Sequence, residues 1–141
     1  MSEVKYMKMT TKGRYGLRAM IDLSRHYEKN TYISLKSISE RQNISENYLE
    51  RLLAKLRKAE LVITHRGTQG GYMLNKLPKE INVRDILLAV EEPLFIVECT
   101  KEKENFCLAK ENCTSNYVWA KMAEGIKQIS EEIYLDELIN N

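Results

Sequence analysis

The chain has 141 residues, of which 43% are apolar and 30% are charged, and its formal net charge is +2. This length suffices for one ordinary domain with a short association element, and it excludes two large domains. The small net charge hides a division between Lys79 and Glu80. Residues 1–79 carry 16 Lys and Arg against 7 Asp and Glu, a charge of +9, whereas residues 80–141 carry 6 against 13, a charge of −7. We therefore expect the first part, and not the second, to attract polyanions such as nucleic acid.

No apolar stretch approaches the roughly 18 residues that a membrane-spanning helix needs, and the opening MSEVKYMKMT has no apolar core of a secretory signal. We therefore expect a cytoplasmic protein with no membrane partner. Thiols stay reduced in that compartment, so clustered cysteines are expected to be ligands or sensors rather than a disulfide framework.

Residues 11–27 form the first predicted helix, because apolar side chains recur there at steps of three and four residues. A second helix is expected over residues 35–42 with Ser34 as its N-cap, and a third is expected to begin after Ser45. The turn between them, centred on Asn43, has the length that a helix-turn-helix needs. The third helix would bury four leucines, namely Leu49, Leu52, Leu53 and Leu56.

A hairpin with glycines in its connection is expected after the third helix. Residues 61–64 and 70–74 have strand composition, and residues 65–69 connect them as a longer loop. A hairpin that directly follows a helix-turn-helix is a wing. Asn82 is then expected to cap a short helix over residues 83–90.

The last predicted element is one long helix with a continuous apolar seam. Its seam residues are spaced by four, four, three and four positions, and they are Val118, Met122, Ile126, Ile129 and Ile133. The preceding elements already close a small core, so the seam is expected to pack on a second copy of the chain. The sequence thus predicts a mainly α fold with a small β-hairpin wing. Residues 1–79 would form the DNA-binding part, and residues 80–141 would carry a polar loop and the dimerisation helix.

Residues that could bind DNA lie at the start of the third helix and in the wing. In a helix-turn-helix the first turns of the second helix enter the major groove, and the candidates there are Ser45, Asn47, Tyr48, Glu50 and Arg51. Glu50 could instead form an ion pair within the helix, and Lys55 is expected to bind phosphate. The wing candidates are Arg66, which suits the negative minor groove, and Gln69, Gly70 and Gly71, which would allow close approach.

All three cysteines lie in the polar loop at about residues 91–115, at positions Cys99, Cys107 and Cys113. Thiolates are soft ligands and oxidisable nucleophiles, so the cluster predicts an iron-sulfur centre, a redox pair or a zinc site. The intervals of seven and five residues lack the tight Cys-x-x-Cys knuckle of structural zinc, and free thiols without a role are the other alternative. Neither histidine nor paired carboxylates accompany Cys113 in a catalytic motif, so we do not expect an enzyme.

Four stretches of the sequence form a recognisable signature, namely Met9-Thr-Thr-Lys-Gly-Arg-Tyr-Gly-Leu-Arg18, Ile44-Ser-Glu-Asn-Tyr-Leu-Glu50, Leu53-Ala-Lys-Leu-Arg-Lys58 and Arg66-Gly-Thr-Gln-Gly-Gly-Tyr72. They resemble the Rrf2 family of bacterial transcription regulators in its IscR-like iron-sulfur branch, over about residues 7–138. The resemblance implies a winged-helix homodimer that binds a double-stranded DNA operator and is joined through the last helix. It also implies that Arg66 enters the minor groove and that the major groove is faced by Asn47, Tyr48, Glu50 and Arg51.

The resemblance further implies that the three cysteines ligate an iron-sulfur cluster, for which we expect the 2Fe-2S type. This sequence has Asn116 where the iron-sulfur members place a histidine, and Arg14 where other branches place an acidic ligand. The fourth ligand is therefore unassigned, and incomplete protein ligation predicts an exchangeable cluster. We expect a dimeric regulator that senses iron-sulfur or redox status. The alternative is a cluster-free regulator controlled by thiol oxidation or by binding a metabolic enzyme.

Overall fold

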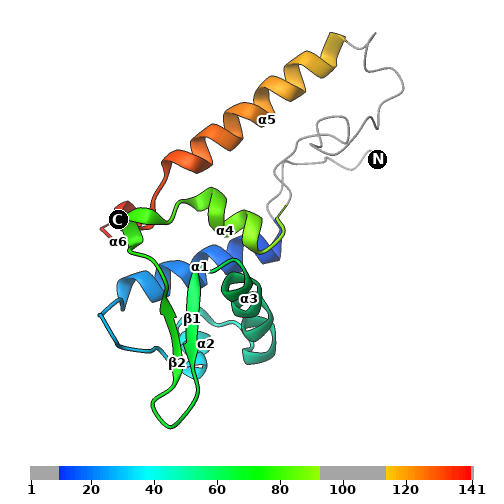
Figure 1. Cartoon of the computed structure of the whole chain (residues 1–141). Coiled ribbons are helices and arrows are strands. Elements are labelled where there is room, and N and C mark those ends of the chain that lie inside the picture. Colours follow the sequence, from blue (N-terminus) through cyan, green and yellow to red (C-terminus); the bar gives the residue numbers. More distant parts are fainter. Residues whose placement is uncertain (1–9, 93–113, 141) are drawn as a thin grey trace.

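The computed structural model describes residues 10–92 and 114–140, and Figure 1 shows the arrangement of its elements. In chain order they are α1 (Thr11–Arg25), α2 (Leu35–Gln42), α3 (Glu46–Lys58), β1 (Val62–His65), β2 (Gly71–Leu74), the 3-10 helix η1 (Pro78–Glu80), α4 (Val83–Ala89), α5 (Thr114–Glu132) and α6 (Leu135–Ile139). The predicted class, mainly α with a small hairpin, is confirmed. In the part of the chain that is described, no helix has both the length and the apolar character to cross a membrane.

Local sequence explains the helix-turn-helix formed by α2 and α3. The hydroxyl of Ser34 accepts from the Ser37 amide at 3.1 Å, and that of Ser45 accepts from the Tyr48 amide at 3.3 Å. Each helix therefore has an N-cap, of which Ser34 was predicted as a cap and Ser45 as the residue before the helix, and each cap satisfies an amide that the helix leaves unbonded. Asn43 ends α2 with a φ of 53°, a left-handed conformation that asparagine adopts more readily than most residues.

The wing is a two-stranded antiparallel hairpin in which His65 lies opposite Gly71 next to the loop. Ile33, in the link before α2, pairs with Tyr72 through backbone bonds of 2.8 and 2.7 Å. The hairpin is thus attached to the segment that enters the helix-turn-helix, and its strands lie against α1 and α3.

One apolar core joins α1, α2, α3, the hairpin, α4 and α6. The four predicted leucines of α3 are at most 2% exposed. Ile86 and Val90 at α4 and Leu135 of α6 are fully buried in the same cluster. The core therefore continues across the predicted boundary after Lys79, and packing does not by itself separate residues 1–79 from residues 80–141.

The helix α5 extends away from this core in Figure 1. It packs mainly against α4, and large apolar side chains along it are 44 to 68% exposed, namely Tyr117, Val118, Met122 and Ile129. An apolar row of this size left open to solvent is unusual in a monomer.

The prediction of one continuous last helix was wrong at its end. α5 stops at Glu132, so Ile133 of the predicted seam lies beyond the helix. The carbonyl oxygen of Ile133 accepts from the Val83 amide at 2.8 Å, and Leu135 then enters the core with no exposed surface. Burial of Leu135 and the pairing of Tyr134 with Asn82 turn α6 back onto the shared core, a return that helical periodicity does not reveal.

Candidate nucleic-acid interface

The outer side of α3 carries an exposed polar row. Asn47, Glu50 and Arg51, together with Ala54, line a shallow hollow of about 300 Å³, while the leucines of the same helix face the core. Asparagine and arginine can each bind a base edge through two hydrogen bonds, and a glutamate can accept from the amino group of cytosine. The exposed cap Ser45 lies at the helix N-terminus, where free amides and the helix dipole favour a phosphate.

Tyr48 is less exposed than the candidates in the outer row of α3. It is half-buried, and its ring meets that of Tyr15 on α1 edge to face, with centroids 5.8 Å apart. The guanidinium of Arg18 lies 5.2 Å from the centre of the Tyr15 ring. These contacts are of the kind that stabilise packed aromatic pairs, so Tyr48 anchors α3 to α1, and its contact with DNA stays a prediction.

The loop of the wing exposes Arg66 and Gln69. Gly70 and Gly71 beside them are required by the chain's own packing. A Cβ at Gly71, whose φ is +155°, would collide with the backbone of Ile33, and a Cβ at Gly70 would collide with the His65 carbonyl. Gly70 therefore lets the loop of the hairpin close, and Gly71 lets β2 lie against the backbone before α2; the approach of both glycines to DNA stays a prediction.

The second half of α3 is basic, with Lys55, Arg57 and Lys58 in its last turns. Lys55 donates to a carboxylate oxygen of Glu91 at 2.9 Å, and its side chain is 36% exposed. The hydrogen bond and charge of Lys55 lower the pKa of the Glu91 carboxyl below its ordinary value. Glu91 is therefore ionised at neutral pH. It binds the Lys55 ammonium, which is the group that we expect to bind phosphate.

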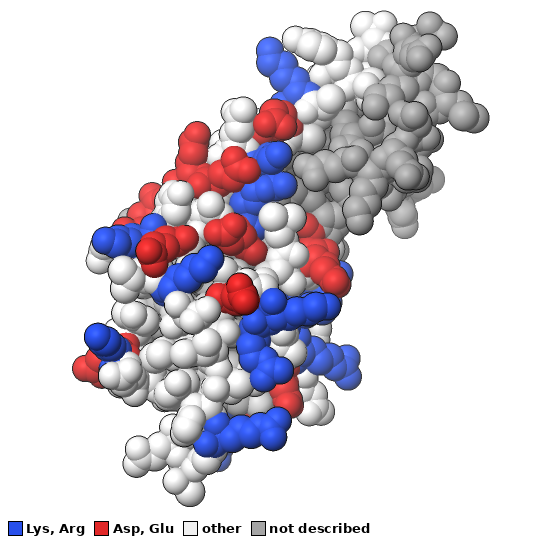
Figure 2. Space-filling view, viewed as in Figure 1, with Lys and Arg blue, Asp and Glu red and all other residues white. Residues whose placement is uncertain are grey.

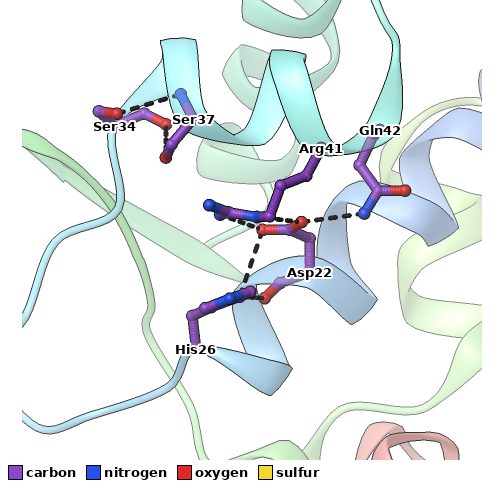
Figure 3. Close-up of polar contacts among 6 residues, drawn as sticks. All are labelled: Asp22, His26, Ser34, Ser37, Arg41 and Gln42. Atoms are coloured by element: carbon purple, nitrogen blue, oxygen red, sulfur yellow. Dashed lines mark hydrogen bonds and ion pairs between the residues drawn. The ribbon is translucent and has the colours of Figure 1, made fainter.

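A buried carboxylate joins α1 to the helix-turn-helix, as Figure 3 shows. Asp22 is 2% exposed, and it accepts from the Arg41 guanidinium at 2.9 and 2.7 Å and from the Gln42 amide group at 2.9 Å. The side-chain oxygen of Gln42 accepts from Arg18 at 3.2 Å, and its carbonyl accepts from the same guanidinium. Arg41 and Gln42 are the last residues of α2. The network therefore fixes the turn that leads into α3.

Burial raises the pKa of the Asp22 carboxyl, but the hydrogen bonds from Arg41 and Gln42 and the charges of Arg41 and His26 outweigh it, so the net pKa is lowered. Asp22 is therefore ionised at neutral pH. Sequence reasoning missed this network. A usable signal exists, since Asp22 shares a helical face with the buried Ala19, and an acidic residue on a core-facing position calls for a partner.

The charge division of the sequence is visible on the surface. In Figure 2, Lys and Arg gather in the lower right of the molecule, where Figure 1 places α3, and Asp and Glu are frequent higher up, over α4 and α5. A basic surface beside an exposed polar helix suits the phosphate backbone of a nucleic acid.

The predicted metal ligands Cys99, Cys107 and Cys113 lie outside the described residues. Asn116 is described, in the first turn of α5, and its side-chain oxygen is buried with no hydrogen-bond donor among the described residues. A buried acceptor without a partner is costly, so this oxygen fits an additional donor or a metal. Within the described ranges there is no group of three or more His, Cys, Asp or Glu that could hold a metal ion.

A helix-turn-helix, a wing and an exposed polar recognition helix on a basic surface define a winged-helix transcriptional regulator that binds DNA. The chain belongs to the Rrf2 family, described as iron-dependent transcriptional regulators, whose family model matches residues 9–141. It is 38% identical to the HTH-type transcriptional regulator IscR of Pectobacterium carotovorum and 40% identical to that of Erwinia tasmaniensis. Each match covers 96% of this chain and 80% of the relative. These relatives are named as regulators and not as enzymes.

Solved structures agree with this assignment. T. potens IscR has a TM-score of 0.72 and 40% identity, over 95% of this chain and 87% of that one. CymR, described as the global cysteine regulator of B. subtilis, has a TM-score of 0.76 and 35% identity, over 96% and 98% of the two chains. The predicted winged-helix fold and the resemblance to IscR-like regulators are confirmed.

Proposed function

We propose that the chain is a homodimeric regulator that binds a double-stranded DNA operator through α3 and the wing and responds to iron-sulfur or redox status. The observation that carries the DNA contact is the exposed row Asn47, Glu50 and Arg51 on α3. Core leucines hold the opposite face, so the row stays directed outward. The row would bind base edges, and the loop of the wing, with Arg66, would enter the minor groove.

Backbone contacts complete the proposed interface. Ser45 at the start of α3 and Gln69 in the wing are exposed, and each has a polar group that can reach a phosphate. Lys55 adds a positive charge along the same helix. Such contacts fix the position of the protein on DNA, while the α3 row selects the sequence.

The proposed dimer rests on the open apolar row of α5. Val118, Met122 and Ile129 are 46, 44 and 59% exposed, and a second copy of the same helix would cover them. A two-fold pairing of this kind would present two α3 helices to successive major grooves of a pseudo-palindromic operator.

We further propose that Cys99, Cys107 and Cys113 hold an iron-sulfur cluster of the 2Fe-2S type in a cytoplasmic protein. The donor set fits, because three thiolates within fifteen residues are suitable iron ligands. The unpartnered oxygen of Asn116 offers a weak fourth donor three residues after Cys113. The bound cluster would supply redox-sensitive iron, and a weak fourth ligand would keep it exchangeable. The description of the family as iron-dependent supports this proposal.

A second candidate is a cluster-free regulator controlled by thiol oxidation or by a metabolic enzyme. The likeness to CymR favours it, since one similar structure, at 35% identity and a TM-score of 0.71, is the oxidized form of Staphylococcus aureus CymR. Asn116 at the family's histidine position favours it as well. In this case the cysteines would act without iron.

Purification without oxygen, followed by visible absorption and analysis of iron and sulfide, separates the two candidates. The cluster proposal predicts a coloured protein, and Cys113→Ser should lose most of the colour. A colourless, iron-free protein after anaerobic reconstitution would refute the cluster and leave the DNA-binding proposal standing.

Operator binding is tested by Arg66→Ala, which should weaken affinity by about 1–3 kcal/mol if the arginine enters a groove. Lys76→Ala is the matched control, because Lys76 is also exposed but follows β2 at the opposite end of the hairpin from the loop. Equal affinities of the two variants would contradict the wing contact.

A further inference from the structure

Glu92 caps α1 from a position 82 residues away in the sequence. It is 4% exposed, and it accepts from the amides of Thr10 at 2.8 Å and Gly13 at 3.2 Å and from the Thr10 hydroxyl. α1 has no acidic residue in its own first turn, and Thr10 makes no side-chain cap bond within the helix. Glu92 therefore supplies the acceptor and the negative charge that a helix N-terminus requires.

The two residues before Glu92 also contact α1 and α3. Val90 is fully buried, and a Cβ at Gly16 would lie 2.9 Å from its Cγ1, so the end of α4 packs closely on α1. Glu91, with a φ of 61°, accepts from Lys55 of α3 at 2.9 Å. We call residues 90–92 the clasp, because they hold both α1 and α3.

The clasp directly precedes the part of the sequence that carries the cysteines. Cys99 follows Glu92 by seven residues, which can span at most about 25 Å of extended chain. The cysteines therefore follow the clasp closely along the chain. The other two cysteines lie within the next fourteen residues.

We propose that the clasp is the regulatory contact between the cysteines and the DNA-binding surface. When the clasp is closed, Glu92 caps α1 and Glu91 holds the ammonium of Lys55. When a change at the cysteines draws Glu92 away from α1, Lys55 is released and binds a DNA phosphate. This proposal rests on the proposed function, because it requires DNA at α3 and cysteines that respond to iron or redox state.

The competition for Lys55 is tested by the salt dependence of operator binding. Each additional phosphate neutralised steepens the plot of log affinity against log salt by about 0.9. Glu91→Gln should bind several-fold more tightly at low salt with a slope steeper by about one such unit, and Lys55→Gln should abolish this difference. Glu60→Gln is the control, because it removes an equal charge just after α3 and should leave the slope unchanged. A Glu91→Gln effect that is absent, or that persists in the Lys55→Gln background, would overturn the proposal.

The link to the cysteines is tested by comparing the reconstituted full-length protein with the Cys99→Ser/Cys107→Ser/Cys113→Ser variant. Their operator affinities should differ at least about 5-fold, as expected for an allosteric coupling, and the ratio should fall toward one when both also carry Glu92→Gln. An unchanged ratio would overturn the clasp but not the regulator. If the two proteins bind the operator equally well without Glu92→Gln, both the clasp and the proposed response to iron-sulfur or redox status are overturned.

Hydrogen exchange gives a readout that does not involve DNA. The Gly13 amide should exchange at different rates in the reconstituted protein and in the triple cysteine variant, because only one of the two states keeps Glu92 on α1. Equal protection would contradict the clasp. If Glu92→Gln lowers the melting temperature too far for binding assays, Glu92→Asp provides a second variant with the same charge and a shorter reach.

Discussion

Replacing Asp22 by asparagine is expected to destabilise the protein by about 2 kcal/mol. The asparagine keeps the shape of the side chain but places an NH2 group against a donor of Arg41 or Gln42. A hydrogen bond to a charged group contributes about 1.5–3 kcal/mol. The lower part of this range applies, because the Arg41 side chain is 37% exposed and water replaces part of the lost contact.

Thermal unfolding at one fixed protein concentration measures the effect, since the stability of an oligomer depends on concentration. A loss of 2 kcal/mol corresponds to a decrease in Tm of about 6 °C for a chain of this size. Glu40→Gln serves as the control, because Glu40 is an exposed acidic residue next to Arg41 on α2, and its Tm should stay within about 1 °C of the parent. If Asp22→Asn also stays within that range, the network does not stabilise the helix-turn-helix as argued.

Four further predictions follow from the described contacts. The pKa of Asp22 is lowered in the folded state, so the ionised carboxylate contributes its full stability above the unfolded pKa of about 3.9 and loses it as pH falls through the lower folded value. Asp22→Asn should therefore make Tm decrease less steeply in acid than it does in the parent protein. Parallel plots of Tm against pH for the two proteins would contradict this. Gly71→Ala should lower the free energy of unfolding, measured in urea, by about 1–3 kcal/mol, because the position has a positive φ and an added Cβ would meet Ile33. Gly125→Ala is the control and should leave this free energy unchanged or higher, because an added Cβ there meets nothing within 4 Å. Met122→Glu should shift sedimentation toward the monomer, with Gln128→Glu as an exposed control on the same helix; an unchanged dimer would refute the proposed α5 interface. Asn116→His should slow the loss of iron absorbance in air, because imidazole is a better iron ligand than a carboxamide, and equal decay rates would count against Asn116 as the fourth donor.

Caps and periodicity allowed most of the fold to be predicted from the sequence. Ser34 and Asn82 were assigned as N-caps, and the side chain of each accepts a hydrogen bond from a backbone amide in the structure. These features depend on residues within one or two turns of each other, so local sequence is sufficient to predict them. The same reasoning placed Asn47, Glu50 and Arg51 on the exposed face of α3.

The candidate site was predicted less completely. Tyr48 was expected to face DNA, which stays a prediction; the structure adds that its ring packs on Tyr15, a contact with another helix that periodicity along α3 does not show. Lys55 was expected to bind phosphate, which stays a prediction; the structure adds that its ammonium donates to Glu91. Charge and spacing along α3 contain no information about which residue near the end of α4 approaches Lys55.

The sequence alone determined the helix-turn-helix, the wing and the division of charge, because these follow from local propensity, from periodicity and from composition. Only the tertiary structure decided that Glu92 caps α1, that Asp22 holds the end of α2 and that α6 returns to the core after Glu132. Each of these depends on which distant elements meet. The physical reason is that a buried carboxylate is stable only beside particular donors, and folding brings those donors to it from remote parts of the chain.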